Sequence, residues 1–267
     1  MTLAPAQALA VDPTTQPYPI LDGLYYAVAA AYLLAWTLRL FAPRVARTLL
    51  GAGLLLHLAG TLWRGWIIGF LPLTNKFESF SAAALCIAIV ALITWGPRRL
   101  YDLVLLGAGI AAFAGALSFP MRLGFPPPLM RTVWYPIHVP LSFLAYALWI
   151  AAGAAALVWL VDPDADADWQ RRVDRLALQG FALWSLSMIA GGLWGVVAWG
   201  AYFLWDPKVI WSVILWFHYA TLIHVRLTPS LAERPWVRPA LALVGVLWVF
   251  IAYVGTSFMF GMSSHAF

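Results

Sequence analysis

Four of the five histidines in this sequence lie within or beside long apolar stretches: His57, His138, His218 and His224. The fifth, His265, lies close to the C-terminus. An ionisable side chain inside a membrane is costly and is therefore a candidate for function. Neutral imidazole is also the common protein ligand of haem iron, so the chemistry that these residues could perform is iron ligation. A hydrogen bond to a neighbouring helix would explain each histidine equally well.

Spacing separates these histidines into groups. His218 precedes His224 by six residues, or about 240° of helical rotation, so the two point in different directions. We therefore interpret His218 as a structural residue. The remaining histidines form two candidate pairs, His57 with His224 and His138 with His265.

A tryptophan-rich segment runs from Trp194 to Trp211 and holds four of the sixteen tryptophans, together with Tyr202 and Phe203. Aromatic rings offer flat, polarisable faces on which a large planar ligand can stack. An aromatic belt at the membrane interface would produce the same composition, and that alternative remains open. Under either interpretation, Asp206 is expected to cap a helix that begins at Pro207.

The composition requires a lipid environment around the elements that position these residues. Of 267 residues, 63% are hydrophobic and 10% are charged, and the mean hydropathy is +0.84. A soluble domain carries about 25% charged residues, and a membrane-spanning helix needs about 20 apolar residues. We predict an all-α polytopic bundle of about eight transmembrane helices. The expected spans are Leu21–Leu40, Thr48–Phe70, Phe77–Trp95, Leu100–Phe119, Ile137–Val161, Leu176–Ala198, Val209–Leu227 and Pro239–Phe258.

Lysine and arginine are unevenly distributed between alternate loops. One set of loops holds Arg39, Arg44, Arg47, Arg98, Arg99, Arg171, Arg172, Arg175, Arg226, Arg234 and Arg238, and the other holds Arg64, Lys76, Arg122, Arg131 and Lys208. The positive-inside rule places the richer set in the cytoplasm and both termini outside. The net charge of +5 is thus read as a topology signal and not as a nucleic-acid surface. Residues 1–20 are expected to form an external tail, and residues 21–267 a single integral domain.

This orientation brings three separated stretches to the outer face: the start of the span that contains His138, the tryptophan-rich segment, and the tail with His265. His57 and His224 fall in the inner half of the bilayer. Asn75 followed by Glu78 resembles a capping box at the start of the third span. Cys86 is the single cysteine, so the chain has no internal disulfide and any thiol chemistry belongs to a partner.

The tryptophan-rich segment also carries a family resemblance. Its run WGAYFLWDPKVIW, residues 199–211, resembles the WWD signature of the cytochrome c assembly (CcsA/ResC) family. Three further segments resemble that family in the same order along the chain. They are LPLTNKFES at 71–79, the histidine site that starts with Ile137-His138-Val139, and the helix WFHYATLIHVR at 216–226.

The resemblance implies specific roles. His138 and His265 would be the axial ligands of a haem b at the outer face, and His57 and His224 would hold haem transiently within the membrane. The haem platform would comprise Trp199, Tyr202, Trp205, Asp206, Lys208 and Trp211. The charge pattern also places Lys208, Arg122, Arg131 and Arg64 at this face, where they would suit the haem propionates. The implied partners are lipid, a ResB/CcsB-like membrane protein, an apocytochrome c with a CxxCH motif and thiol-reducing proteins, in the bacterial plasma membrane with the functional face outside.

The expected function is haem binding, export and presentation for covalent attachment to apocytochrome c. The chain would be the haem-presenting subunit of a haem-lyase complex and would supply positioning rather than a nucleophile. Val209 stands where the signature has glutamate, Phe203 where it has tryptophan, and the tail around His265 is atypical. These departures keep open a haem-binding regulator outside any synthase, and a transporter of a small solute is the third alternative.

Overall fold

The computed structural model describes residues 17–162, 165 and 167–256, and these residues form an all-α bundle. Eight of the described helices are long and apolar enough to cross a membrane. They are α1 (Pro19–Leu38), α2 (Pro43–Ile68), α3 (Lys76–Ile93), α4 (Arg99–Leu117), α5 (Tyr135–Val161), α6 (Ala167–Trp199), α7 (Pro207–His224, continued by the short turn η3, Val225–Leu227) and α9 (Val237–Phe250, continued by the π-helical turn η4, Ile251–Gly255). The short elements η2 (Pro128–Met130) and α8 (Pro229–Ala232) lie in connections.

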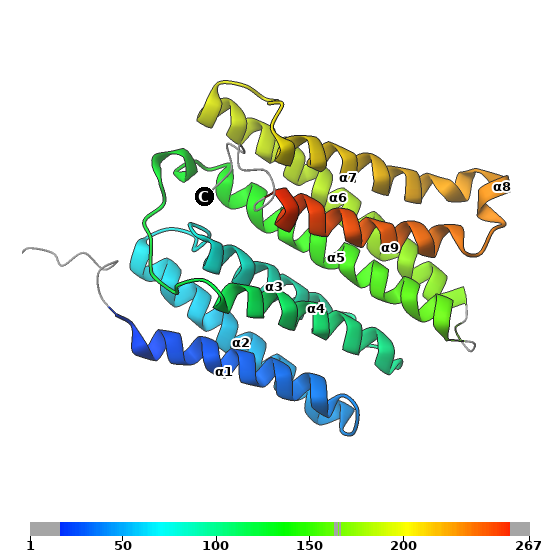
Figure 1. The fold of residues 1–267 in the computed structure, drawn as a ribbon, viewed down its shortest axis with the longest axis horizontal. Coiled ribbons are helices and arrows are strands. Elements are labelled where there is room, and N and C mark those ends of the chain that lie inside the picture. Colours follow the sequence, from blue (N-terminus) through cyan, green and yellow to red (C-terminus); the bar gives the residue numbers. More distant parts are fainter. Residues whose placement is uncertain (1–16, 163–164, 166, 257–267) are drawn as a thin grey trace, which may run out of the picture.

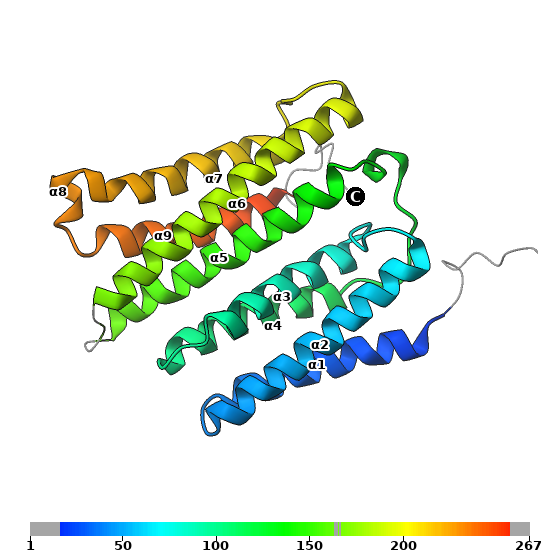
Figure 2. The same ribbon diagram turned by 180° about the vertical axis from the view of Figure 1, so that it is seen from behind.

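The helices form two halves, α1–α4 and α5–α9, which lie side by side in both views (Figures 1 and 2). A long connection, residues 118–134, runs from the end of α4 to the start of α5. Contacts between the halves are made chiefly by α5, which packs against α3 and α4 on one side and against α6 and α9 on the other. Buried small residues along α5 allow this close approach: Ala145, Ala147, Ala151, Ala152, Gly153, Ala154, Ala155 and Ala156.

The two ends of the bundle differ in charge. The arginine-rich end carries the α1–α2, α3–α4, α5–α6 and α7–α9 connections, together with the eleven arginines that the charge pattern assigns to the cytoplasm. Ion pairs join neighbouring helices and connections there: Arg39–Asp102 at 2.7 Å, Arg98–Asp162 at 3.1 Å and Arg238–Asp174 at 2.7 Å. The opposite end carries the α2–α3, α4–α5 and α6–α7 connections, and we call it the cavity end.

The predicted architecture is confirmed: a polytopic helical bundle with eight spans, in which α1 begins and η4 ends at the same end. Two helix starts were wrong. The second helix begins at Pro43 and not near Thr48. The sixth helix begins at Ala167 and not near Leu176, because its charged first turns remain helical and are paired at the arginine-rich end. Asp174 there binds Arg238, and Arg171 binds Asp168.

Candidate functional site

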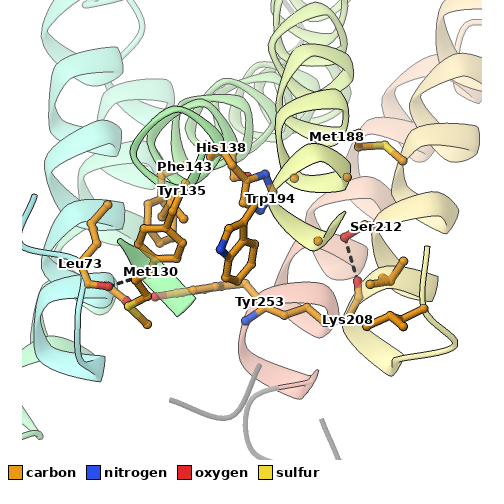
Figure 3. Close-up of a pocket in the computed structure, with 18 of the residues that line it drawn as sticks. Leu73, Met130, Tyr135, His138, Phe143, Met188, Trp194, Lys208, Ser212 and Tyr253 are labelled. Carbon is orange, nitrogen blue, oxygen red and sulfur yellow. Dashed lines mark hydrogen bonds between the residues drawn. The ribbon is translucent and has the colours of Figure 1, made fainter. Parts of the chain in front are cut away.

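A cavity of about 240 Å³ opens at the cavity end between the two halves. Its walls come from the start of α3, the first turns of α5, the end of α6, the 199–206 connection, the start of α7 and Tyr253 of η4. Aromatic side chains dominate the lining, and a few polar groups project into it, including His138 and Lys208 (Figure 3). The cavity therefore suits a flat, largely apolar ligand that carries some polar groups.

His138 lines this cavity with one ring nitrogen committed to the protein. Its Nδ1 lies 2.8 Å from the backbone oxygen of Ser187 and 3.0 Å from the Ser187 hydroxyl. A carbonyl oxygen can only accept, so Nδ1 carries the proton and Nε2 keeps its lone pair. No described residue makes a hydrogen bond to Nε2. A backbone carbonyl on one nitrogen is the usual arrangement for a histidine that binds a metal through the other.

Two buried hydroxyls hold the backbone and ring of His138 in place. Ser142 donates to the His138 carbonyl at 3.0 Å, and Ser187 lies 2.9 Å from the same oxygen. The two hydroxyls are 2.6 Å apart. This network joins α5 to α6 behind the imidazole, so the ring is oriented before any ligand arrives.

Trp194 forms the wall beside the imidazole. Its ring is nearly parallel to that of His138, with 6.1 Å between centroids and 23° between planes (Figure 3). Its edge meets Tyr135 at 5.1 Å and Trp199 at 4.7 Å, and its indole N–H donates to Leu129 at 2.7 Å. This cluster makes a rigid aromatic surface at the cavity end.

Two adjacent glycines allow the imidazole and Tyr202 to lie against α6. A Cβ atom at Gly191 would come within 2.7 Å of the His138 ring, and one at Gly192 would overlap the Tyr202 ring. Any larger residue would push these side chains away from the helix. The glycine pair is thus a steric requirement of the site that the tryptophan-rich pattern does not reveal.

The structure divides the predicted platform into three groups. Trp199, Tyr202 and Lys208 line the cavity. Asp206 is buried and caps α7 by accepting from the Lys208 backbone N–H at 2.8 Å, as predicted. The cavity lining does not include Trp205, which is 86% exposed, or Trp211, whose ring lies 5.5 Å from that of Trp248.

The opposite wall is fixed by a buried ion pair between α2 and α3. Arg64 binds one carboxylate oxygen of Glu78 through Nε at 3.0 Å and Nη2 at 2.8 Å, and both side chains are 1% exposed. Arg64 also donates to the backbone oxygens of Met121 and Arg122, both at 2.9 Å. The other Glu78 oxygen accepts from the backbone N–H of Thr74 at 2.8 Å.

The predicted capping box is half confirmed by these contacts. Asn75 caps α3 by accepting from the Glu78 backbone N–H at 2.9 Å. The Glu78 side chain reaches back to Thr74 instead of Asn75, because it is also held by Arg64. Residues 73–76, which line the cavity, are therefore held from two sides.

His57 lies outside the cavity and is fully buried. Its Nδ1 is 3.0 Å from the Tyr32 hydroxyl, and its Nε2 is 2.7 Å from the Ser81 hydroxyl. The rings of Tyr25 and Phe113 close the remaining sides. Both nitrogens are thus engaged, and iron could not reach either one without breaking a hydrogen bond.

The structure does not bring the predicted membrane pair together. His224 is exposed at the last turn of α7 and bonds to the backbone oxygen of Ala220 at 2.7 Å. It belongs to the α5–α9 half, whereas His57 belongs to the α1–α4 half (Figure 1). His218 bonds to Leu241 at 2.8 Å, which agrees with a structural role. His265 lies outside the described residues.

Comparison with known proteins identifies the family. The model of "Cytochrome C assembly protein" matches residues 27–263. The chain belongs to this family. It is 26% identical over 94% of its length to "Cytochrome c biogenesis protein CcsA" of Synechococcus sp. (strain CC9902), of which it covers 97%. It is 28% identical to the protein of the same name from Chlamydomonas reinhardtii, over 84% of this chain and 68% of that protein.

A solved structure titled "Cytochrome c Heme Lyase CcmF" shares the fold, with a TM-score of 0.67 and 18% identity. The match covers 93% of this chain but 46% of that chain, so the family member described here has about half its length. Membership gives this multi-pass membrane protein a role in cytochrome c maturation and implies that it handles haem and apocytochrome c. The cavity described above lies at the start of α5, at the end of the bundle opposite the arginine-rich connections.

Proposed function

We propose that the protein binds haem b in the cavity through His138 and presents it for covalent attachment to apocytochrome c. The observation that carries this proposal is the free Nε2 of His138, which lies in an aromatic cavity with its tautomer set by Ser187. A neutral imidazole oriented in this way is a ready ligand for haem iron.

The lining residues fit such a ligand. Trp194, Trp199 and Tyr202 offer faces for a porphyrin ring. Lys208 projects its ammonium into the same space, and no described lining residue carries a carboxylate. A bound porphyrin would thus meet apolar surface around its ring and positive charge near its propionates.

His265 is the proposed second axial ligand. The last described helical residue, Thr256, lies shortly beyond Tyr253, which lines the cavity. His265 follows nine residues later, and nine residues of extended chain reach up to about 30 Å. Two imidazoles would fill both axial positions and keep the iron from other ligands while haem waits.

The attachment chemistry itself would come from the thiols of the apocytochrome, which add to the vinyl groups of haem. The described cavity lining includes no cysteine, and the bonds to the haem vinyl groups would be made by the apocytochrome's own thiols. Its contribution is to bind the ring, orient it and exclude water. The haem-lyase activity would belong to a complex with a ResB/CcsB-like membrane protein. Thiol-reducing proteins would provide the apocytochrome thiols in reduced form.

The arginine distribution supports an orientation for this site. Eleven arginines at the opposite end favour the cytoplasm. The cavity would then face outward from the plasma membrane of a bacterium, where a secreted apocytochrome can reach it. His57 and His224, which the fold holds apart, are not proposed as a pair within one chain.

The absorption spectrum of the purified full-length protein in lipid nanodiscs tests this proposal. We expect a low-spin spectrum typical of bis-histidine haem, and weaker haem retention in His138→Ala and in His265→Ala. Spectra that are unchanged in both variants would remove the proposed ligands. A parent protein with no Soret band, and no haem uptake on addition, would remove haem binding altogether.

One observation favours a second function. Val209 stands where the family signature has glutamate, and it lines the cavity. The site therefore lacks a carboxylate that the signature would place in its lining. A haem-binding regulator outside any synthase would tolerate this loss. Deletion of the gene separates the two functions, because c-type cytochromes would disappear if the chain presents haem and persist if it only senses haem.

A further inference from the structure

The charge of the cavity lining indicates which charged groups a ligand should carry, in addition to the parts that the imidazole and the tryptophans would contact. Two described lining residues are cationic, Lys76 and Lys208, and none is acidic. Positive side chains in a partly enclosed cavity attract anionic groups of a ligand. The described lining thus favours a ligand with negative charge at two places.

Lys208 approaches the cavity from the second half of the molecule. It lies in the first turn of α7, and its side chain extends into the space beside Trp194 (Figure 3). Its ammonium makes no hydrogen bond or ion pair with any residue in the described ranges. The nearby Asp206 carboxylate accepts from the Lys208 backbone N–H at the helix start, and its negative charge also acts on the Lys208 ammonium.

Lys76 approaches from the first half. It is the first residue of α3, and its ammonium lies 5.7 Å from the centre of the Phe119 ring. Asn75, which precedes it, is tied to the backbone oxygen of Arg122 at 3.2 Å, and Thr74 is tied to Glu78. The Arg64–Glu78 ion pair therefore fixes the backbone from which Lys76 projects.

We propose that Lys76 and Lys208 form a dicarboxylate site in which each ammonium binds one propionate of an iron porphyrin ligated by His138. This inference rests on the proposed function and adds a chemical requirement to it, because the ligand must carry two carboxylates. It also adds Lys76, a residue outside the tryptophan-rich segment. Since the lysines come from different halves, the ligand would connect the α1–α4 half to the α5–α9 half.

Binding of two iron porphyrins that differ only in charge tests the proposal. The probes are iron protoporphyrin IX and its dimethyl ester, titrated against the full-length protein in neutral-lipid nanodiscs by quenching of tryptophan fluorescence. We expect Lys76→Gln and Lys208→Gln each to weaken binding of the diacid about fivefold, the effect of about 1 kcal/mol for one charged pair. The double variant should lose about 25-fold, and the ester should bind all variants within about twofold.

Two control variants separate specific contacts from general charge. Arg122→Gln removes an exposed cation at the same end that does not line the cavity, and diacid binding should stay within about twofold. Lys208→Arg keeps the charge and should retain most of the affinity. Equal losses for the diacid and the ester would overturn the dicarboxylate site while leaving haem binding intact. Failure of the parent to bind either porphyrin would overturn the proposed function and this inference together.

Discussion

His57 and His138 are both histidines of spanning helices, yet the structure gives them opposite chemistry. His57 lies among α1, α2 and α3 with a hydroxyl on each ring nitrogen. His138 has a backbone carbonyl on one nitrogen, and the other nitrogen is left for the cavity. Depth in the membrane therefore does not distinguish the proposed ligand, His138, from a histidine that only bonds within the protein. What distinguishes them is whether the second nitrogen has a partner inside the protein.

Removal of the His138 imidazole should have the largest effect on haem retention. We expect His138→Gly to weaken haem retention at least about 100-fold, because removal of even an outer-shell partner of a metal ligand can cost that much. Added imidazole should restore the Soret band, since the glycine leaves room for a free ligand. Titration of haem with and without imidazole measures both effects. Retention that is unchanged in the glycine variant would show that another residue holds the iron.

A methyl group added at Gly191, behind the His138 ring, should have the next largest effect on haem retention. Gly191→Ala would push the His138 ring away from α6, and we expect about tenfold weaker haem retention with about 1–3 kcal/mol lost from stability. Gly51→Ala is the matched control, because a Cβ atom there meets nothing within 4 Å. That control should leave both haem binding and thermal stability close to those of the parent. Equal behaviour of the two alanine variants would refute the steric role of Gly191.

Substitution of His57 should lower the stability of the protein and leave haem retention nearly unchanged, unlike the expected effect at His138. His57→Ala leaves the hydroxyls of Tyr32 and Ser81 unpaired in a buried site, so we expect a loss of about 2–4 kcal/mol in stability. Haem retention should stay within about twofold, since the two sites do not share partners. Thermal unfolding and haem titration of the same preparation measure these quantities. A large loss of haem with normal stability would instead make His57 a ligand.

The smallest effect is expected at His224. Its side chain is exposed, and its Nδ1 bonds to the Ala220 carbonyl one turn earlier in the same helix. We expect His224→Ala to change stability by no more than about 0.5 kcal/mol and to leave the absorption spectrum of added haem unchanged. A shifted Soret band in this variant would show that the last turn of α7 communicates with the cavity.

Much of the fold follows from the sequence for simple physical reasons. Apolar runs of about 20 residues fix the spans, and arginine-rich connections alternate with arginine-poor ones. The helix caps at Asn75 and Asp206 also follow, because a cap depends on residues that are close in sequence. To predict that His138 lies near the tryptophan-rich segment, the membrane topology was needed as well as the sequence motifs.

The details of the site depend on partners that are distant in sequence. The hydrogen bonds of His57 come from residues 25 and 24 positions away, and those of His138 from a residue 49 positions away. Trp205 matches the family signature yet faces outward, whereas Trp194 and Tyr135, which are outside the quoted run, build the wall. A single sequence gives no signal for such pairs unless side-chain directions are known.

The arrangement of polar links between the halves has a mechanical consequence. At the arginine-rich end, Arg172 reaches across to the Thr94 carbonyl and the Tyr101 ring, and Arg98 binds Asp162. At the cavity end, Tyr135 donates to Leu73 at 2.7 Å. Because more of these links lie at the arginine-rich end, a tilt of one half against the other would pivot near that end. Helix α5 is about 40 Å long, so a rotation of about 5° at this pivot would move the two halves apart at the cavity end by about 3.5 Å. A displacement of that size would be comparable to the spacing of stacked aromatic rings.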